Sequence, residues 1–114
     1  FALSEFANAA RSFEKAVKLS PRDLGLNARW VRALIRNYEF DEARRAIAGL
    51  GRLPKSRSTA FRLQGELAMR EERYVDALAF FKQGLREGSA DPALYLLYGD
   101  GLYQLRQFED ALFF

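Results

Sequence analysis

The sequence predicts an all-α protein, an α-solenoid of 34-residue helix–turn–helix repeats, and three observations lead to this fold class. Apolar residues follow a helical spacing over most of the 114 residues. Short polar turns and prolines interrupt that spacing at intervals. Two positions also recur with a constant period along the chain: an aromatic residue at Phe6, Phe40, Tyr74 and Phe108, and an alanine at Ala9, Ala43, Ala77 and Ala111.

The repeat period divides the chain into four parts. We expect the end of one repeat at residues 1–23, complete repeats at 24–57 and 58–91, and a truncated repeat at 92–114. The chain has no initiator methionine, and its ends fall inside repeat units. We therefore interpret it as a fragment of a longer protein.

Each complete unit has the pattern of two helices joined by a short polar turn. In the first complete unit, helices are expected from residue 24 to about 37 and from residue 41 to about 53. Turns between the two helices of a unit are predicted at residues 37–39, 71–73 and 105–107.

Proline marks the breaks between units, at Pro21, Pro54 and Pro92. Its missing N–H and its effect on the preceding residue end or start helices at these points. In the last break, Asp91 followed by Pro92 predicts a helix N-cap with proline in the first helical turn.

The recurring alanine has a packing reason. It leaves room for two helices to approach closely, and the large apolar residue one turn later fills the groove that this creates. That residue is Phe13, Ile47 or Phe81. A single helix pair of this kind cannot bury its apolar face, so neighbouring pairs are expected to stack.

The 34-residue period, the helix pair and the Ala-x3-Phe phrase closely resemble the tetratricopeptide repeat family. The family's first-helix pattern, W-x2-L-G-x2-Y, is matched more loosely by Phe61-x2-Gln64-Gly65-x2-Ala68, Tyr95-x2-Tyr98-Gly99-x2-Leu102 and Asn27-x2-Trp30-Val31-x2-Leu34. The family's closing proline is kept at Pro21, displaced by one residue at Pro54 and replaced by Ser89. The resemblance covers the whole chain and is strongest in the second helices.

The resemblance implies a scaffold in which the first helices of successive units line a concave groove for a peptide, a helix or a partner domain. By analogy, the groove residues are Ala28, Arg32, Ile35, Arg62, Glu66, Met69, Leu96, Asp100 and Tyr103. One subclass of the family grips a carboxylate through Lys and Asn on these helices. The matching positions here, among them Ala28, Leu63, Ala93 and Leu97, supply no such groups.

Charge is uneven along the chain. Residues 24–57 hold eight Lys or Arg against three Asp or Glu, and Arg29, Arg32 and Arg36 share one face of a predicted helix. This basic stripe could pair with an acidic partner surface; the alternative is an ordinary solvated face. Acidic residues in the later units interrupt a continuous basic path, so nucleic acid is not an expected partner.

Composition argues against catalysis. The chain has no His and no Cys, which removes the usual acid–base residue near neutral pH as well as thiol and disulfide chemistry. We find no catalytic constellation and expect no enzyme activity, no cofactor and no metal. No run of ~18 apolar residues occurs, so this fragment is not expected to span a membrane.

A narrower interpretation rests on overall resemblance. The chain uses Arg far more than Lys, and its units match the family pattern loosely. In both respects it looks like the tetratricopeptide regions of bacterial envelope proteins that export exopolysaccharide for biofilms. In those proteins the repeats precede the outer-membrane pore. This implies a periplasmic location and a polysaccharide-modifying enzyme as the partner, with the polysaccharide itself as a second candidate ligand. Two alternatives stay open: a cytoplasmic peptide-binding adaptor or regulator, and a passive spacer or self-association module.

Overall fold

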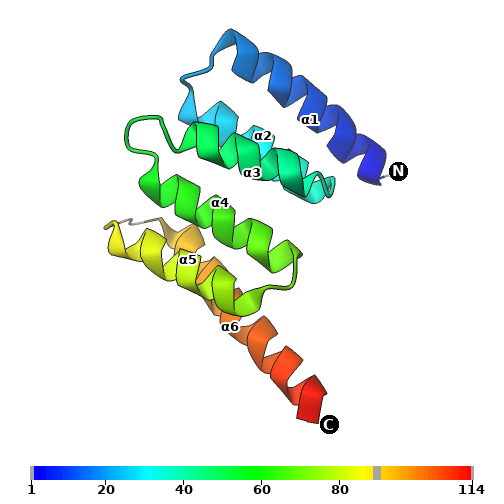
Figure 1. Cartoon of the computed structure of the whole chain (residues 1–114), viewed down its shortest axis with the longest axis vertical. Helices are drawn as coiled ribbons and strands as arrows, with labels where there is room; N and C mark the ends of the chain where they lie inside the picture. Colours follow the sequence, from blue (N-terminus) through cyan, green and yellow to red (C-terminus); the bar gives the residue numbers. More distant parts are fainter. Residues whose placement is uncertain (1, 89–90, 114) are drawn as a thin grey trace.

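Helices make up all the regular secondary structure of residues 2–88 and 91–113, the part of the chain that the computed structural model describes. Six helices follow one another along these residues (Figure 1). They are α1 (Ala2–Leu19), α2 (Leu24–Arg36), α3 (Phe40–Leu50), α4 (Arg57–Arg70), α5 (Tyr74–Arg86) and α6 (Pro92–Phe113). The predicted all-α class is therefore confirmed.

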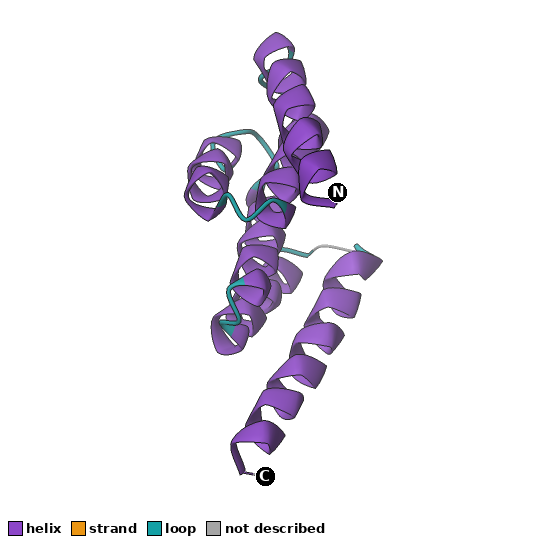
Figure 2. Cartoon of the chain, turned by 90° about the vertical axis from the view of Figure 1, so that its right-hand side faces the viewer, coloured by secondary structure: helices purple, strands orange, loops and turns teal. Residues whose placement is uncertain are grey.

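The helices stack in the order of the sequence. Each helix packs against the next, and two further contacts join α2 to α4 and α4 to α6. Figure 1 shows α1 to α5 as a layered stack, with α6 crossing behind α5 and extending past it at the C-terminal end. In the orthogonal view of Figure 2, α6 lies to one side of the stack. The contacts between α2, α4 and α6 place the first helices of successive predicted units along one side of the molecule.

The turns after α2 and α4 have the same backbone geometry. Tyr38 and Glu72, which occupy matching positions of successive units, both adopt the left-handed conformation, with φ of 60° and 61°. In the first turn, the N–H of Glu39 donates to the carbonyl of Leu34 (2.9 Å), and that of Tyr38 donates to Ile35 (3.1 Å). These are the two bonds of a Schellman motif, and the same pair closes the second turn, one unit later. The turns predicted at 37–39 and 71–73 are confirmed.

The third predicted turn, at residues 105–107, does not form. Helix α6 continues through it, and Arg106 instead forms an ion pair with Asp110 one turn later (3.4 Å). A left-handed residue costs roughly 1–2 kcal/mol, which the first two units offset by packing a second helix back on the first. In the continuous α6, Phe108 and Leu112 stay 48% and 70% exposed, so residues 108–113 form no packed second helix like α3 and α5.

The helix boundaries otherwise agree with the sequence pattern, apart from one end. Helix α2 stops at Arg36, whereas α3 stops at Leu50, three residues before the expected end. The N-cap predicted at Asp91 is confirmed, because its Oδ1 accepts a hydrogen bond from the N–H of Ala93 (3.0 Å) and α6 begins at Pro92. The cap fixes where α6 starts and hence how it faces α4.

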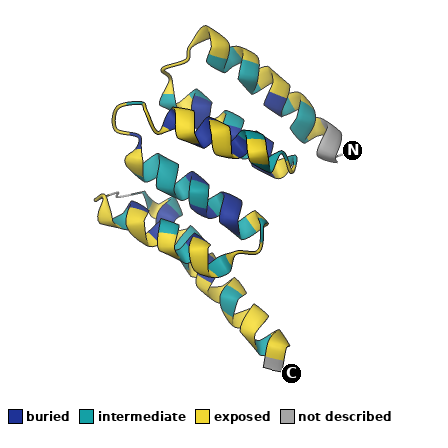
Figure 3. Ribbon diagram, in the orientation of Figure 1, coloured by how far each residue is buried: buried dark blue, intermediate teal, exposed yellow. Residues whose placement is uncertain are grey.

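The packing predicted for the alanine and the following large residue occurs in the two segments predicted as complete units, residues 24–57 and 58–91. Ala43 and Ala77 are fully buried, as is Phe81, and Ile47 is 4% exposed. Figure 3 shows buried residues concentrated where α2 to α5 face one another. The pattern weakens at the two ends of the chain, where Ala9 is only half-buried and Ala111 is exposed. In α1 it is the next residue, Ala10, that is fully buried.

An ion pair joins α1 to the turn between α2 and α3. Arg11 Nη2 donates to both carboxylate oxygens of Glu39, at 2.9 and 2.8 Å, and Asn37 Nδ2 donates to the same carboxylate at 2.8 Å. Partial burial by itself would raise the pKa of Glu39. The hydrogen bonds from Asn37 and Arg11 and the charge of Arg11 outweigh burial, so the pKa lies below its ordinary value.

We expect Glu39→Gln to lower the free energy of unfolding at pH 7 and to leave it unchanged in strong acid. A carboxyl with a lowered folded-state pKa stabilises the protein above its unfolded pKa, and this contribution is lost as pH falls through the folded value. Urea unfolding of both proteins across pH 7 to 2 measures the difference. A difference that persists at the lowest pH would mean that the carboxylate charge is not what stabilises this contact.

None of the helices in the described residues is long and apolar enough to cross a membrane. This agrees with the expectation from the sequence.

Candidate functional site

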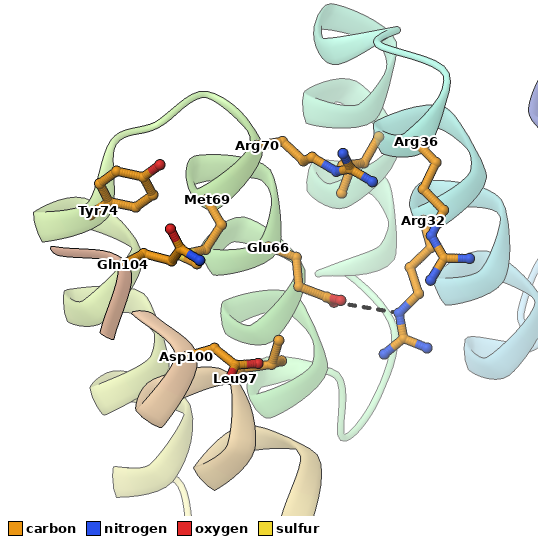
Figure 4. Close-up of a pocket in the computed structure, with 10 residues that line it drawn as sticks. Arg32, Arg36, Glu66, Met69, Arg70, Tyr74, Leu97, Asp100 and Gln104 are labelled. Carbon is orange, nitrogen blue, oxygen red and sulfur yellow. Dashed lines mark hydrogen bonds and ion pairs between the residues drawn. The ribbon is translucent and has the colours of Figure 1, made fainter. Parts of the chain in front are cut away.

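A cleft of about 350 Å³ opens along the side where α2, α4 and α6 meet. Figure 4 shows that its side chains come from these three helices and from the start of α5. The lining residues are Arg32, Ile35, Arg36, Glu66, Met69, Arg70, Tyr74, Leu97, Asp100 and Gln104. Five of the nine groove residues expected from the sequence lie here, so the structure brings most of the predicted site together.

Most of the lining residues occupy matching positions of successive units. They form three rows in which neighbouring members are one repeat period apart. Two rows run from α2 through α4 to α6, and the third has members on α2 and α4. The rows are Arg32, Glu66 and Asp100; Ile35 and Met69; and Arg36, Arg70 and Gln104. The cleft therefore combines a row of mixed charge, an apolar row and a row with two arginines.

The mixed-charge row belongs to an ion-pair network that ties the three helices together. Arg32 Nε lies 3.4 Å from Glu66 Oε2, and Arg62 Nε lies 3.8 Å from the same oxygen. Arg62 Nη1 in turn lies 2.7 Å from Oδ2 of Asp91, the residue that caps α6. The side chains of Arg62 and Glu66 are only 15% and 23% exposed, so solvent screens this pair less than a surface pair. The network holds α2, α4 and α6 in register across the cleft.

We expect Asp91→Ala to destabilise the protein by about 1–2 kcal/mol, because it removes the N-cap of α6 together with the ion pair to Arg62. Asp91→Asn keeps an oxygen for the cap and loses only the charge, so it is expected to cost less than Asp91→Ala. Chemical denaturation of both variants measures the two contributions. Equal losses would show that the ion pair, rather than the cap, carries the effect.

Three lining charges have no ion-pair partner among the described residues: Arg36, Arg70 and Asp100. All three are exposed. Arg36 lies with its guanidinium carbon 6.0 Å from the ring centroid of Phe6, which leaves its charge uncompensated. In Figure 4, Arg36 and Arg70 stand on one side of Glu66, and Asp100 lies on the other beside Leu97. Apart from the ion-paired Arg32 and Glu66, the charges of the cleft are thus two arginines at one edge and Asp100 at the other (Figure 4).

The remaining predicted site residues lie elsewhere. Arg29 lines a second depression, of about 410 Å³ between α1 and α2, which Arg32 and Arg36 also border. The basic stripe therefore separates two depressions. Arg62 lies in the ion-pair network just outside the cleft lining. Tyr103 is 63% exposed and does not line the cleft.

Two further groove assignments also need correction. Ala28 was expected on the groove surface, but it is 7% exposed and belongs to the hydrophobic core, because α2 turns that position towards its neighbours. Leu96 is 69% exposed and lies outside the cleft. Arg70 and Gln104 line the cleft but were not among the predicted groove residues. Both could have been predicted, because they lie one and two repeat periods after Arg36.

The chemistry that these residues offer is ionic and apolar contact. Guanidinium groups at the arginine edge can form paired hydrogen bonds to carboxylates. Ile35, Met69 and Leu97 can cover an apolar side chain. No group of His, Cys, Asp or Glu suited to hold a metal ion occurs within residues 2–88 and 91–113.

By its fold the chain belongs to the class of all-helical proteins. Comparison with protein-family models and with curated proteins found no match. The family resemblance described above therefore rests on the residues of this chain alone.

Proposed function

We propose that this chain is a tetratricopeptide-repeat scaffold that performs no catalysis and binds a protein partner in the cleft between α2, α4 and α6. The observation that carries the proposal is the composition of that cleft. Its lining comes from matching positions of successive units, and it combines an apolar floor with charges that have no partner within the described residues. Binding sites commonly combine apolar surface with a few placed polar groups in this way.

We place the scaffold in a bacterial envelope protein that exports exopolysaccharide. In this setting the partner is a periplasmic polysaccharide-modifying enzyme recruited through the cleft. The support for this narrower proposal is the composition of the chain, in which 14 of the 18 basic residues are arginine, and its resemblance to the periplasmic repeat regions of such proteins. A cytoplasmic adaptor that binds a peptide is the alternative that the same cleft supports.

Site-specific photo-crosslinking tests the proposal. A photoreactive phenylalanine analogue is placed at Gln104, in the cleft, or at Lys82, which is exposed on α5 away from it. Each protein is mixed separately with a periplasmic and a cytosolic extract, irradiated and analysed by mass spectrometry. The proposal predicts one dominant adduct from Gln104 and none from Lys82. Equal crosslinking from both positions, or none from Gln104, would contradict it, and the extract that supplies the adduct decides between the two settings.

Self-association is a second candidate function, favoured by a specific feature of α6. Tyr95, Leu96, Leu102 and Tyr103 are between 47% and 69% exposed. Tyr95 and Leu96 lie four and three residues before Gly99, and Leu102 and Tyr103 lie three and four residues after it. A Cβ atom added at Gly99 would meet nothing within 4 Å. This symmetric pattern suits an antiparallel pairing of two copies of α6 about Gly99, since a two-fold interface must be self-complementary. Sedimentation velocity over a dilution series tests it, and a concentration-independent monomer would rule it out.

A further inference from the structure

We propose that the cleft between α2, α4 and α6 recognises an acidic peptide segment, with two carboxylates along the Arg36–Arg70 edge and an apolar side chain over Met69. The inference rests on the proposed function, because it names the chemistry of the partner that this same cleft binds. It states which kind of peptide the unpaired charges of the cleft would bind.

The cationic edge is not neutralised from within the cleft. Glu66 is the nearest candidate in the mixed-charge row, but its Oε2 already lies within 4 Å of both Arg32 and Arg62. Asp100 lies across the cleft beside Leu97 (Figure 4). Arg36 and Arg70 are exposed and form no ion pair among the described residues. An incoming carboxylate would therefore meet two guanidinium groups that hold no carboxylate already, and at Arg36 it would bind beside the Phe6 ring, whose centroid lies 6.0 Å from the guanidinium carbon.

Helix position explains only part of why arginine stands at these two places. Arg36 and Arg70 are the last residues of α2 and α4, where a positive charge interacts favourably with the helix dipole. That interaction is worth less than about 1 kcal/mol at an exposed end, and it leaves the guanidinium donors free. Each arginine offers donors in a planar fork that matches a carboxylate. The repeat spacing that places both at one edge suits two acidic side chains along a peptide.

The rest of the cleft determines the other features of the ligand. Met69 and Leu97 present apolar surface in the cleft, with the buried Ile35 behind it, which favours an apolar side chain beside the charged groups. Asp100 on the opposite edge would repel a further carboxylate. The ligand is therefore acidic on one side only and is not a uniformly acidic chain.

The test begins with a display library of random 12-residue peptides, selected on the folded protein. The strongest binders are then synthesised with a fluorophore and titrated by fluorescence anisotropy. We expect the selected peptides to share acidic residues flanking an apolar one. The double variant Arg36→Glu, Arg70→Glu is expected to weaken their binding by on the order of tenfold or more, because charge-assisted hydrogen bonds are lost and replaced by repulsion.

A matched control carries the same change of net charge. Arg22 and Arg52 are exposed in turns and do not line the cleft, so Arg22→Glu, Arg52→Glu should leave binding within about twofold of the parent at physiological salt, where distant surface charges are screened. Circular dichroism verifies that both double variants are folded. Binding that falls equally in the two variants would overturn the proposal, since the effect would then be one of net charge.

The remaining outcomes separate this inference from the proposed function. Peptides that are selected without acidic residues, and that crosslink from position 104, would overturn the acidic ligand and leave the binding cleft in place. Failure to select any peptide, with no adduct from position 104 in either extract, would count against both.

Discussion

Replacing Phe81 by alanine is expected to destabilise the protein by roughly 3–5 kcal/mol, the usual cost of deleting a large buried aromatic side chain. Phe81 is the largest fully buried side chain of the described residues, and it packs in a buried cluster with Ala68, Ala77 and Leu94. Because this cluster joins α4, α5 and α6, the cavity is expected to loosen both contacts of α5. The site network depends on the position of α6, so partner binding is expected to weaken as well.

Urea unfolding followed by circular dichroism measures the effect of Phe81→Ala. Val75, on the same helix, is 67% exposed, so Val75→Ala serves as the control and is expected to change the free energy of unfolding by no more than about 0.5 kcal/mol. A midpoint for Phe81→Ala as close to the parent as that of Val75→Ala would show that the buried face of α5 has been misassigned.

Replacing Gly65 by valine is the second change with a large expected effect. A Cβ atom at Gly65 would lie 2.3 Å from Cε1 of Phe81, well inside contact distance, and the ring is too buried to move aside. The equivalent positions one unit earlier are Val31 and Ile47, which are 0% and 4% exposed. One unit therefore combines glycine with phenylalanine where the other combines two residues of middle size.

Gly65→Val is accordingly expected to cost at least about 1–3 kcal/mol through overpacking. The double variant Gly65→Val, Phe81→Ile should be more stable than the sum of the single changes allows, since it restores the pairing of the preceding unit. A double-mutant cycle measured by chemical denaturation gives the coupling. Gly49→Val is the control, because a Cβ there meets nothing within 4 Å. Strictly additive effects would mean that the two positions do not share one space.

The contact of residues 65 and 81 also bears on one departure of the first helices from the repeat pattern, Val31 in place of glycine. Gly65 leaves room for the Phe81 ring, whereas in the preceding unit Val31 belongs to the same buried cluster as Ile47, the smaller residue at the position that matches Phe81. When each helix is compared with the family pattern separately, valine at position 31 counts as a mismatch. The paired residues conserve the volume of the contact while both identities change.

Much of the candidate site could be predicted because the repeat fixes which residues share a position. Arg32, Glu66 and Asp100 were expected in one groove, and they line one cleft. The ionic partners could not be predicted in the same way. Glu66 meets Arg62 one turn earlier on its own helix, but its contact with Arg32 depends on how α2 and α4 pack.

Sequence patterns were enough to predict the helical class and the cap at Asp91, which depend on backbone preferences within a few residues, and the period, which depends on residues that recur along the chain. The same patterns located the turns, but packing decided which of them form. Three features depend on tertiary packing: the continuation of α6 through residues 105–107, the burial of Ala28, and the two arginines left unpaired at one edge of the cleft. The physical reason is the same in each case. A turn, a buried face or an ion pair is stable only when another part of the protein packs against it, and local sequence does not specify that contact.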